Sequence, residues 1–102
     1  MEMKQLELEN MDAGFLPDGT EIKVGDIVLY EMGSGNGITR IIMHCGKLSL
    51  EENFLYGDKI SVGHVLTDGC NRITKMSLVD VYKYYKERGW DVGSVIAKFG
   101  KK

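Results

Sequence analysis

Residues 21–30 read Glu-Ile-Lys-Val-Gly-Asp-Ile-Val-Leu-Tyr, and this stretch decides the fold. Its first half alternates polar and apolar residues, as a half-buried strand does, and its last four residues are all apolar. Gly25-Asp26 interrupts the alternation, and a glycine inside a strand pattern is typical of a bulge or bend. We therefore expect a strand over residues 22–32 whose bend lets it serve two sides of a small barrel.

The glycine-rich stretch 33–37 follows this strand and predicts the tip of a hairpin, with a return strand over residues 38–45. By glycine content the stretch resembles a phosphate-binding loop, but it lacks the GK[ST] ending and opens no helix. Gly46-Lys47 predicts a two-residue turn. Short strands separated by glycine turns favour a small barrel or sandwich, and the further strands are expected over residues 48–50, 59–67 and 70–76.

Ser77 begins the clearest helix of the sequence. Ser77 and Asp80 have the spacing of a capping box, and Gly89 is a natural end for the helix. The apolar residues recur at helical spacing and predict one stripe that faces the core. The members of this predicted core stripe are Leu78, Val81, Tyr82 and Tyr85.

A second short helix is expected over residues 91–99. We predict a mainly β fold with a C-terminal helix (α+β), in which an amphipathic helix closes a small β-barrel. The expected organisation is an N-terminal arm over residues 1–11, the barrel over 12–76 and a C-terminal helical segment packed on it over 77–102. The expected inward-facing residues of the second helix are Val92, Val95, Ile96 and Phe99.

The chain of 102 residues has the composition of one soluble globular domain, with 43% hydrophobic and 27% charged residues. The N-terminus lacks the order of a signal peptide, and no stretch approaches about 18 apolar residues, so we expect no membrane partner. Because Cys45 and Cys70 are the only cysteines, we expect no disulfide framework and a cytoplasmic location.

Charge is distributed unevenly along the chain, although the net charge is −2. Residues 1–26 carry seven acids and two lysines, a net charge of −5, and residues 71–102 carry eight basic residues and three acids, a net charge of +5. Two interpretations follow. The basic end can attract a nucleic acid or another anionic partner, or the two ends can attract each other within one fold.

The chain holds two histidines and two cysteines, which raises the question of a zinc site or a nucleophile. The neighbours His44 and Cys45 point to opposite faces of a strand, so they do not share a metal easily, and no CxxC or HxxxH pair occurs. A pairing of Cys45 with His64 as nucleophile and base lacks an orienting residue. With Cys70 also read as an ordinary cysteine, we expect a non-enzymatic protein with no metal and no cofactor.

Aromatic residues alternate with cations near the end of the predicted helix, and such groups anchor many interfaces. A protein partner is therefore expected, and stacking of bases on the same basic face makes a nucleic acid the alternative partner. Exposed strand edges also allow homo-oligomers. The predicted contact residues are Lys83, Tyr84, Arg88 and Trp90 of this segment, with Met32, Ser34 and Asn36 of the hairpin tip.

Residues 19–28 resemble the GxxIxxGDIV opening of YopX-like phage proteins. The further residues Tyr30, Gly35, Gly37 and Ile38 continue a pattern similar to that of KOW, Tudor and CarD-type modules, which are SH3-like barrels. This resemblance implies an SH3-like barrel. It also implies an accessory protein of a phage or mobile element that binds a host or virion protein assembly in the cytoplasm of a bacterial or phage-infected cell.

A second resemblance is to the β-domain of LexA-type and signal-peptidase-type serine–lysine peptidases. Gly14 stands where that family has its serine nucleophile, and Thr39 stands where it has its base, so the resemblance implies an inactive derivative. The order SMxP, GDIVL, [HK]RI, GxL and GxV of that family corresponds to residues 14–17, 25–29, 39–41, 46–48 and 63–65, which read GFLP, GDIVL, TRI, GKL and GHV.

Overall fold

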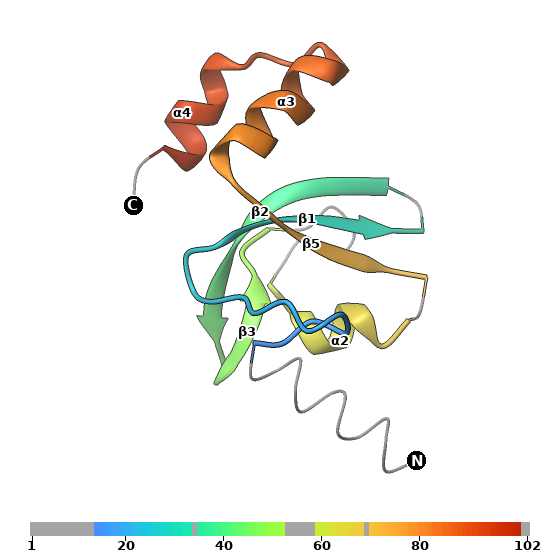
Figure 1. The fold of residues 1–102 in the computed structure, drawn as a ribbon. Coiled ribbons are helices and arrows are strands. Elements are labelled where there is room, and N and C mark those ends of the chain that lie inside the picture. The colour runs from blue at the N-terminus through green and yellow to red at the C-terminus, as the bar shows by residue number, and fades with distance from the viewer. Residues whose placement is uncertain (1–13, 34, 53–58, 69, 101–102) are drawn as a thin grey trace.

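The structure is a computed structural model and describes residues 14–33, 35–52, 59–68 and 70–100 (Figure 1). Its elements are a curved antiparallel sheet, a short helix and a C-terminal pair of helices. In chain order they are β1 (Ile27–Met32), β2 (Gly35–His44), β3 (Lys47–Leu50), β4 (Ile60–Ser61), α2 (Val62–Leu66), β5 (Arg72–Met76), α3 (Leu78–Arg88) and α4 (Gly93–Phe99).

The sheet has five strands in the order β4-β3-β2-β1-β5, and every neighbouring pair is antiparallel. The predicted mainly β fold with C-terminal helices is therefore confirmed, while the described strands form an open sheet. β2 is the strand that serves both halves, because its residues up to Arg40 pair with β1 and its residues from Ile41 pair with β3. Figure 1 shows this strand curving through the molecule.

The predicted bulge at Gly25-Asp26 is confirmed. The Gly25 N–H donates to the Ile41 carbonyl at 2.8 Å, and the Ile41 N–H donates to the Asp26 carbonyl at 2.8 Å, so two residues oppose one. Gly25 has a φ of 96°, a backbone conformation that would be strained in a residue with a side chain. The predicted strand was too long at this end, because the bulge ends the ladder and β1 begins at Ile27.

The hairpin between β1 and β2 is tighter than predicted. Met32 pairs with Gly35, so the glycine-rich residues from 35 onward belong to β2, and the return strand does not begin at residue 38. Tyr30 pairs with Gly37, and a Cβ added at Gly37 would stand 2.6 Å from the Tyr30 hydroxyl oxygen. The tyrosine ring thus lies over the glycine, which explains how a glycine fits inside this strand.

The strand predicted over residues 59–67 is wrong, because only Ile60–Ser61 is extended and α2 follows it. The Ser61 hydroxyl accepts a hydrogen bond of 3.1 Å from the His64 N–H and so caps the helix. Val62 and Val65, three residues apart, then turn the same face to the core. β5 likewise begins at Arg72, two residues later than predicted.

The alternation along β1 divides the molecule into two cores. Val28, Tyr30 and Met32 face an inner core, while Ile27 and Leu29 face the two C-terminal helices. The remaining buried residues of the inner core are Leu16, Ile22, Ile41, Leu48, Leu50, Val62, Val65 and Ile73.

The helices α3 and α4 cover the outer face of the sheet, where Figure 1 shows them as a separate layer. Val81 of α3 and Val95 and Phe99 of α4 pack against Ile27 and Ile38. No helix of the described residues is long and apolar enough to cross a membrane. The N-terminal arm predicted over residues 1–11 lies outside the part of the chain that the structure describes.

Candidate functional site

Helix α3 carries most of the predicted contact residues, and its two ends are fixed as the sequence predicts. The Asp80 N–H donates to the Ser77 hydroxyl, and the Ser77 N–H donates to the Asp80 carboxylate, both at 3.1 Å. The hydrogen bond from the Ser77 backbone holds the pKa of the Asp80 carboxyl below its usual value. Gly89 ends the helix with a φ of 73°, and the Trp90 N–H donates to the Tyr85 carbonyl at 2.9 Å.

The buried face of α3 differs from the predicted core stripe. Val81 is fully buried and Tyr85 is half-buried, as expected, but Leu78 and Tyr82 are 40% and 39% exposed. The predicted outward position of Tyr84 is also wrong, because Tyr84 packs against the second core. The helix is therefore rotated so that residues 81, 84 and 85, at the spacing i, i+3 and i+4, face the sheet and α4.

The structure brings together three of the predicted contact residues, namely Tyr84, Arg88 and Trp90. The Arg88 guanidinium lies 4.1 Å from the centre of the Tyr84 ring and 5.9 Å from the Trp90 ring. The Trp90 ring meets Tyr84 and Tyr85 edge-on, with centroid distances of 5.8 and 5.2 Å. These contacts hold the turn between α3 and α4, so part of this cluster serves the fold.

The Tyr84 hydroxyl is buried and has no hydrogen-bond partner among the described residues. Tyrosine hydroxyls in a protein interior normally find one, since a buried unpaired polar group costs free energy. The neighbouring Arg88 side chain lies over the ring and does not reach the oxygen with a hydrogen bond.

The exposed face of α3 is an apolar and cationic surface, of which the sequence predicts only Lys83 as a contact residue. Val79 is 61% exposed and lies opposite Val81, while the partly exposed Leu78 and Tyr82 lie on the flank of the helix between the two. Lys83 and Lys86 lie on the same side as Val79, are exposed, and make no ion pair with another described residue. We call Leu78, Val79, Tyr82, Lys83 and Lys86 the outer face of α3.

The described residues of the predicted hairpin tip lie in β1 and β2 and not on this face. Met32 is only 7% exposed, because its side chain belongs to the inner core, so it is not a surface contact residue. Asn36 is exposed in β2. Ser34 lies outside the described residues.

An ion pair within the fold joins part of the acidic N-terminal segment to part of the basic C-terminal segment. The Lys75 ammonium lies 3.4 Å from the Asp26 carboxylate, and this pair joins the acidic and basic segments of the sequence. Lys98 pairs with Glu52 at 3.3 Å. Next to the hydrogen bond from the Ser77 backbone, the charge of Lys83 helps to lower the pKa of the Asp80 carboxyl, and neither Lys83 nor Lys86, the cations of the outer face of α3, forms an ion pair with another described residue.

The two histidines and two cysteines are not gathered into one group of potential metal ligands in the part of the chain that the structure describes. His44, Cys45, His64 and Cys70 are all exposed, and no group of three or more potential ligands lies together among the described residues. Both cysteines are free thiols.

The two positions that the resemblance to peptidases singled out, Gly14 and Thr39, have structural roles here. Gly14 has a φ of 110°, and a Cβ at this position would stand 2.7 Å from the Ile22 carbonyl oxygen, so a serine would not fit without a shift of the backbone. Thr39 is buried, and its hydroxyl accepts a hydrogen bond of 3.1 Å from the Glu52 N–H.

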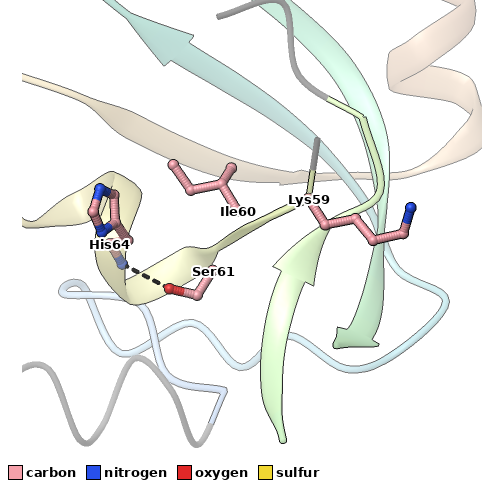
Figure 2. Close-up of a pocket in the computed structure, with 4 residues that line it drawn as sticks. All are labelled: Lys59, Ile60, Ser61 and His64. Carbon is pink, nitrogen blue, oxygen red and sulfur yellow. Dashed lines mark hydrogen bonds between the residues drawn. The ribbon is translucent and has the colours of Figure 1, made fainter. Parts of the chain in front are cut away.

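A depression of about 410 Å³ is lined by Lys59, Ile60, Ser61 and His64 (Figure 2). The Ser61 hydroxyl is the cap of α2, and Figure 2 shows the Lys59 side chain extending away from the His64 ring. The polar groups therefore do not converge on one point, as the groups of a catalytic site do.

The comparisons with known proteins give no relative. No protein-family model, no curated protein and no solved structure matches the chain.

Proposed function

We propose that this chain is a non-enzymatic interaction module that binds a protein partner through the outer face of α3. The observation that carries the proposal is the exposure of Leu78, Val79 and Tyr82 on one side of a helix whose other side is buried. A cluster of exposed apolar side chains on a small protein is typical of a contact surface, and tyrosine is a frequent anchor.

The charges of this face indicate which kind of partner surface would be complementary to it. Lys83 and Lys86 lie beside the apolar side chains, so the complementary surface has apolar residues flanked by acids. Arg88 and Trp90 are exposed at the end of the helix, but they lie on the side of Tyr84 and not on the outer face. We include them as rim contacts.

The fold supports a partly open SH3-like barrel as the scaffold of this module. The strand order, the sharing of β2 between both halves of the sheet, and the short helix that precedes β5 agree with that proposal. Together with the resemblance to phage proteins, they support an accessory protein of a phage or mobile element, which acts on a host or virion assembly in the cytoplasm.

Affinity capture from host lysate tests the proposal when it compares three versions of the chain. We expect the wild type and the control variant Met43→Ser to capture the same partner, because Met43 is an exposed apolar residue of β2. We expect the double variant Val79→Ser/Tyr82→Ser to lose it while keeping the thermal unfolding midpoint. Capture of the same proteins by all three would refute the role of α3.

Nucleic acid is the alternative partner, and the exposed rings of Tyr82 and Trp90 beside lysines are the observation that favours it. Titration of labelled single-stranded DNA and RNA at increasing salt separates the two functions. Binding that falls steeply with salt and is lost in Lys83→Glu/Lys86→Glu would support this alternative, and no binding at low salt would remove it.

A further inference from the structure

Strand β5 is an edge strand of the sheet that the described residues form. One side of Arg72–Met76 pairs with β1 along its whole length, from Arg72 opposite Glu31 to Met76 opposite Ile27. On the other side, no backbone group of β5 makes a hydrogen bond to the backbone of another described residue. Such an edge offers a row of donors and acceptors to an added strand. Figure 1 shows β5 beside β1, with α2 near the start of β5.

A cleft of about 420 Å³ lies beside the first half of this edge. Its apolar walls come from three separate elements, since Leu16 and Pro17 belong to a turn, Leu66 to α2 and Ile73 to β5. This volume is within the range of ligand-binding clefts and suits one large apolar side chain with its backbone.

The walls of the cleft are fixed by hydrogen bonds, so the site is formed before a ligand arrives. The Asn71 side-chain amide donates to the Val65 carbonyl at 2.8 Å and holds the end of α2 against the start of β5. The Asp18 carboxylate accepts the Thr20 N–H at 2.9 Å and holds the opposite turn. A preformed site loses less conformational entropy on binding.

The charge of the edge is positive. β5 contains Arg72 and Lys75 and no acid, and Lys75 already pairs with the Asp26 carboxylate at 3.4 Å, so Arg72 supplies the charge that is unpaired among the described residues. Arg72 is exposed, lines the cleft, and makes no ion pair or hydrogen bond through its side chain with another described residue. Two copies of β5 side by side would bring in two arginines without an ion pair among the described residues and no acid, so the edge favours an acidic strand over a second copy of itself.

We propose that β5 and this cleft form a second binding site, which takes an extended acidic segment of another protein as an added strand. The backbone of the segment pairs with the edge of β5, one apolar side chain enters the cleft between Leu16 and Leu66, and an acid faces Arg72. This is β-strand addition, in which main-chain hydrogen bonds give affinity and a pocket gives specificity. The site is separate from the outer face of α3.

The test uses the full chain and a blocked synthetic hexapeptide that alternates glutamate with valine and leucine. Titration followed by amide NMR shifts should place the largest changes in Arg72–Met76 and at Leu16 and Leu66. Amide hydrogen exchange in β5 should slow when the peptide is bound. A matched peptide with one N-methylated amide on the pairing side should bind about tenfold more weakly, because it lacks one main-chain donor.

A pair of charge variants separates the edge from general electrostatics. Arg72→Glu should weaken binding about fivefold, whereas Lys86→Glu, on α3, should leave the affinity unchanged. Three outcomes would overturn the proposal: shifts that map to α3 or are absent, equal affinity for the N-methylated peptide, and a dimer of the chain whose exchange protection maps to β5. None of these depends on whether α3 binds its own partner.

Discussion

Arg40, in the middle of β2, donates a hydrogen bond of 2.6 Å from Nη2 to the carbonyl oxygen of Phe99, the last residue of α4. The same guanidinium donates from Nη1 to the Gly25 carbonyl at 2.8 Å, and it lies 5.8 Å from the centre of the Phe99 ring. One side chain therefore joins the bulge of the sheet to the end of the helical layer. A cation at the carboxyl end of a helix also complements its dipole.

We expect Arg40→Lys to loosen α4 more than it loosens the sheet. A lysine cannot donate to both carbonyls from a planar group, so the variant should lose about 1–2 kcal/mol of unfolding free energy. Hydrogen exchange should accelerate in Gly93–Phe99 first. The control Arg72→Lys, at an exposed position without a described partner, should change neither quantity. Equal exchange rates in α4 for Arg40→Lys and the wild type would show that the contact does not hold the helix.

Tyr84→Phe is expected to stabilise the protein. The variant removes a buried hydroxyl that has no partner among the described residues and keeps the ring under Arg88. The gain should be about 1 kcal/mol in chemical denaturation, and Tyr82→Phe, at an exposed ring, should change the free energy of unfolding much less. A loss of stability in Tyr84→Phe would mean that the hydroxyl has a bonding partner in solution.

Local signals in the sequence predicted local structure well. The bulge at Gly25-Asp26, the hairpin, and the capping residues Ser77 and Gly89 each depend on residues within one turn or one strand, and each is confirmed. The prediction of a strand over residues 59–67 was wrong, because the preference of valine for strands is weak and local signals for a helix outweigh it. Here the Ser61 cap and the spacing of two valines on one helical face favour the helix α2 over a strand.

The candidate site was harder to predict, because the surface of α3 depends on which side meets the sheet. One possible helical stripe holds Leu78, Val81, Tyr82 and Tyr85, and a second, overlapping stripe holds Val81, Tyr84 and Tyr85. Period alone cannot choose between them. The choice is made by Ile27 and Ile38, which are distant in sequence and present the apolar face that α3 covers.

Stability should depend on pH through Asp80. Its pKa is lowered from 3.8 in the folded state, mainly by the Ser77 backbone hydrogen bond, so the unfolded chain binds the proton more tightly. The contribution of this group is therefore complete above the unfolded pKa and is lost as the pH falls through the folded pKa. We expect the difference in thermal midpoint between wild type and Asp80→Asn to shrink on acidification below about pH 4. A difference that stays constant across this range would exclude the carboxylate as its source.

A substitution in the turn between β2 and β3 should stabilise the protein. His44 pairs with Lys47, so the turn residues are Cys45 and Gly46, one position earlier than the sequence suggested. Both have positive φ, 53° and 77°, as a type I′ turn requires. Cysteine has a Cβ that disfavours this conformation, whereas asparagine adopts it more readily, so Cys45→Asn should stabilise the protein by about 1 kcal/mol. Cys45→Ser is the matched control, because it removes the thiol and keeps the strain. If both variants raised the thermal midpoint equally, the gain would come from loss of the exposed thiol and not from the backbone of the turn.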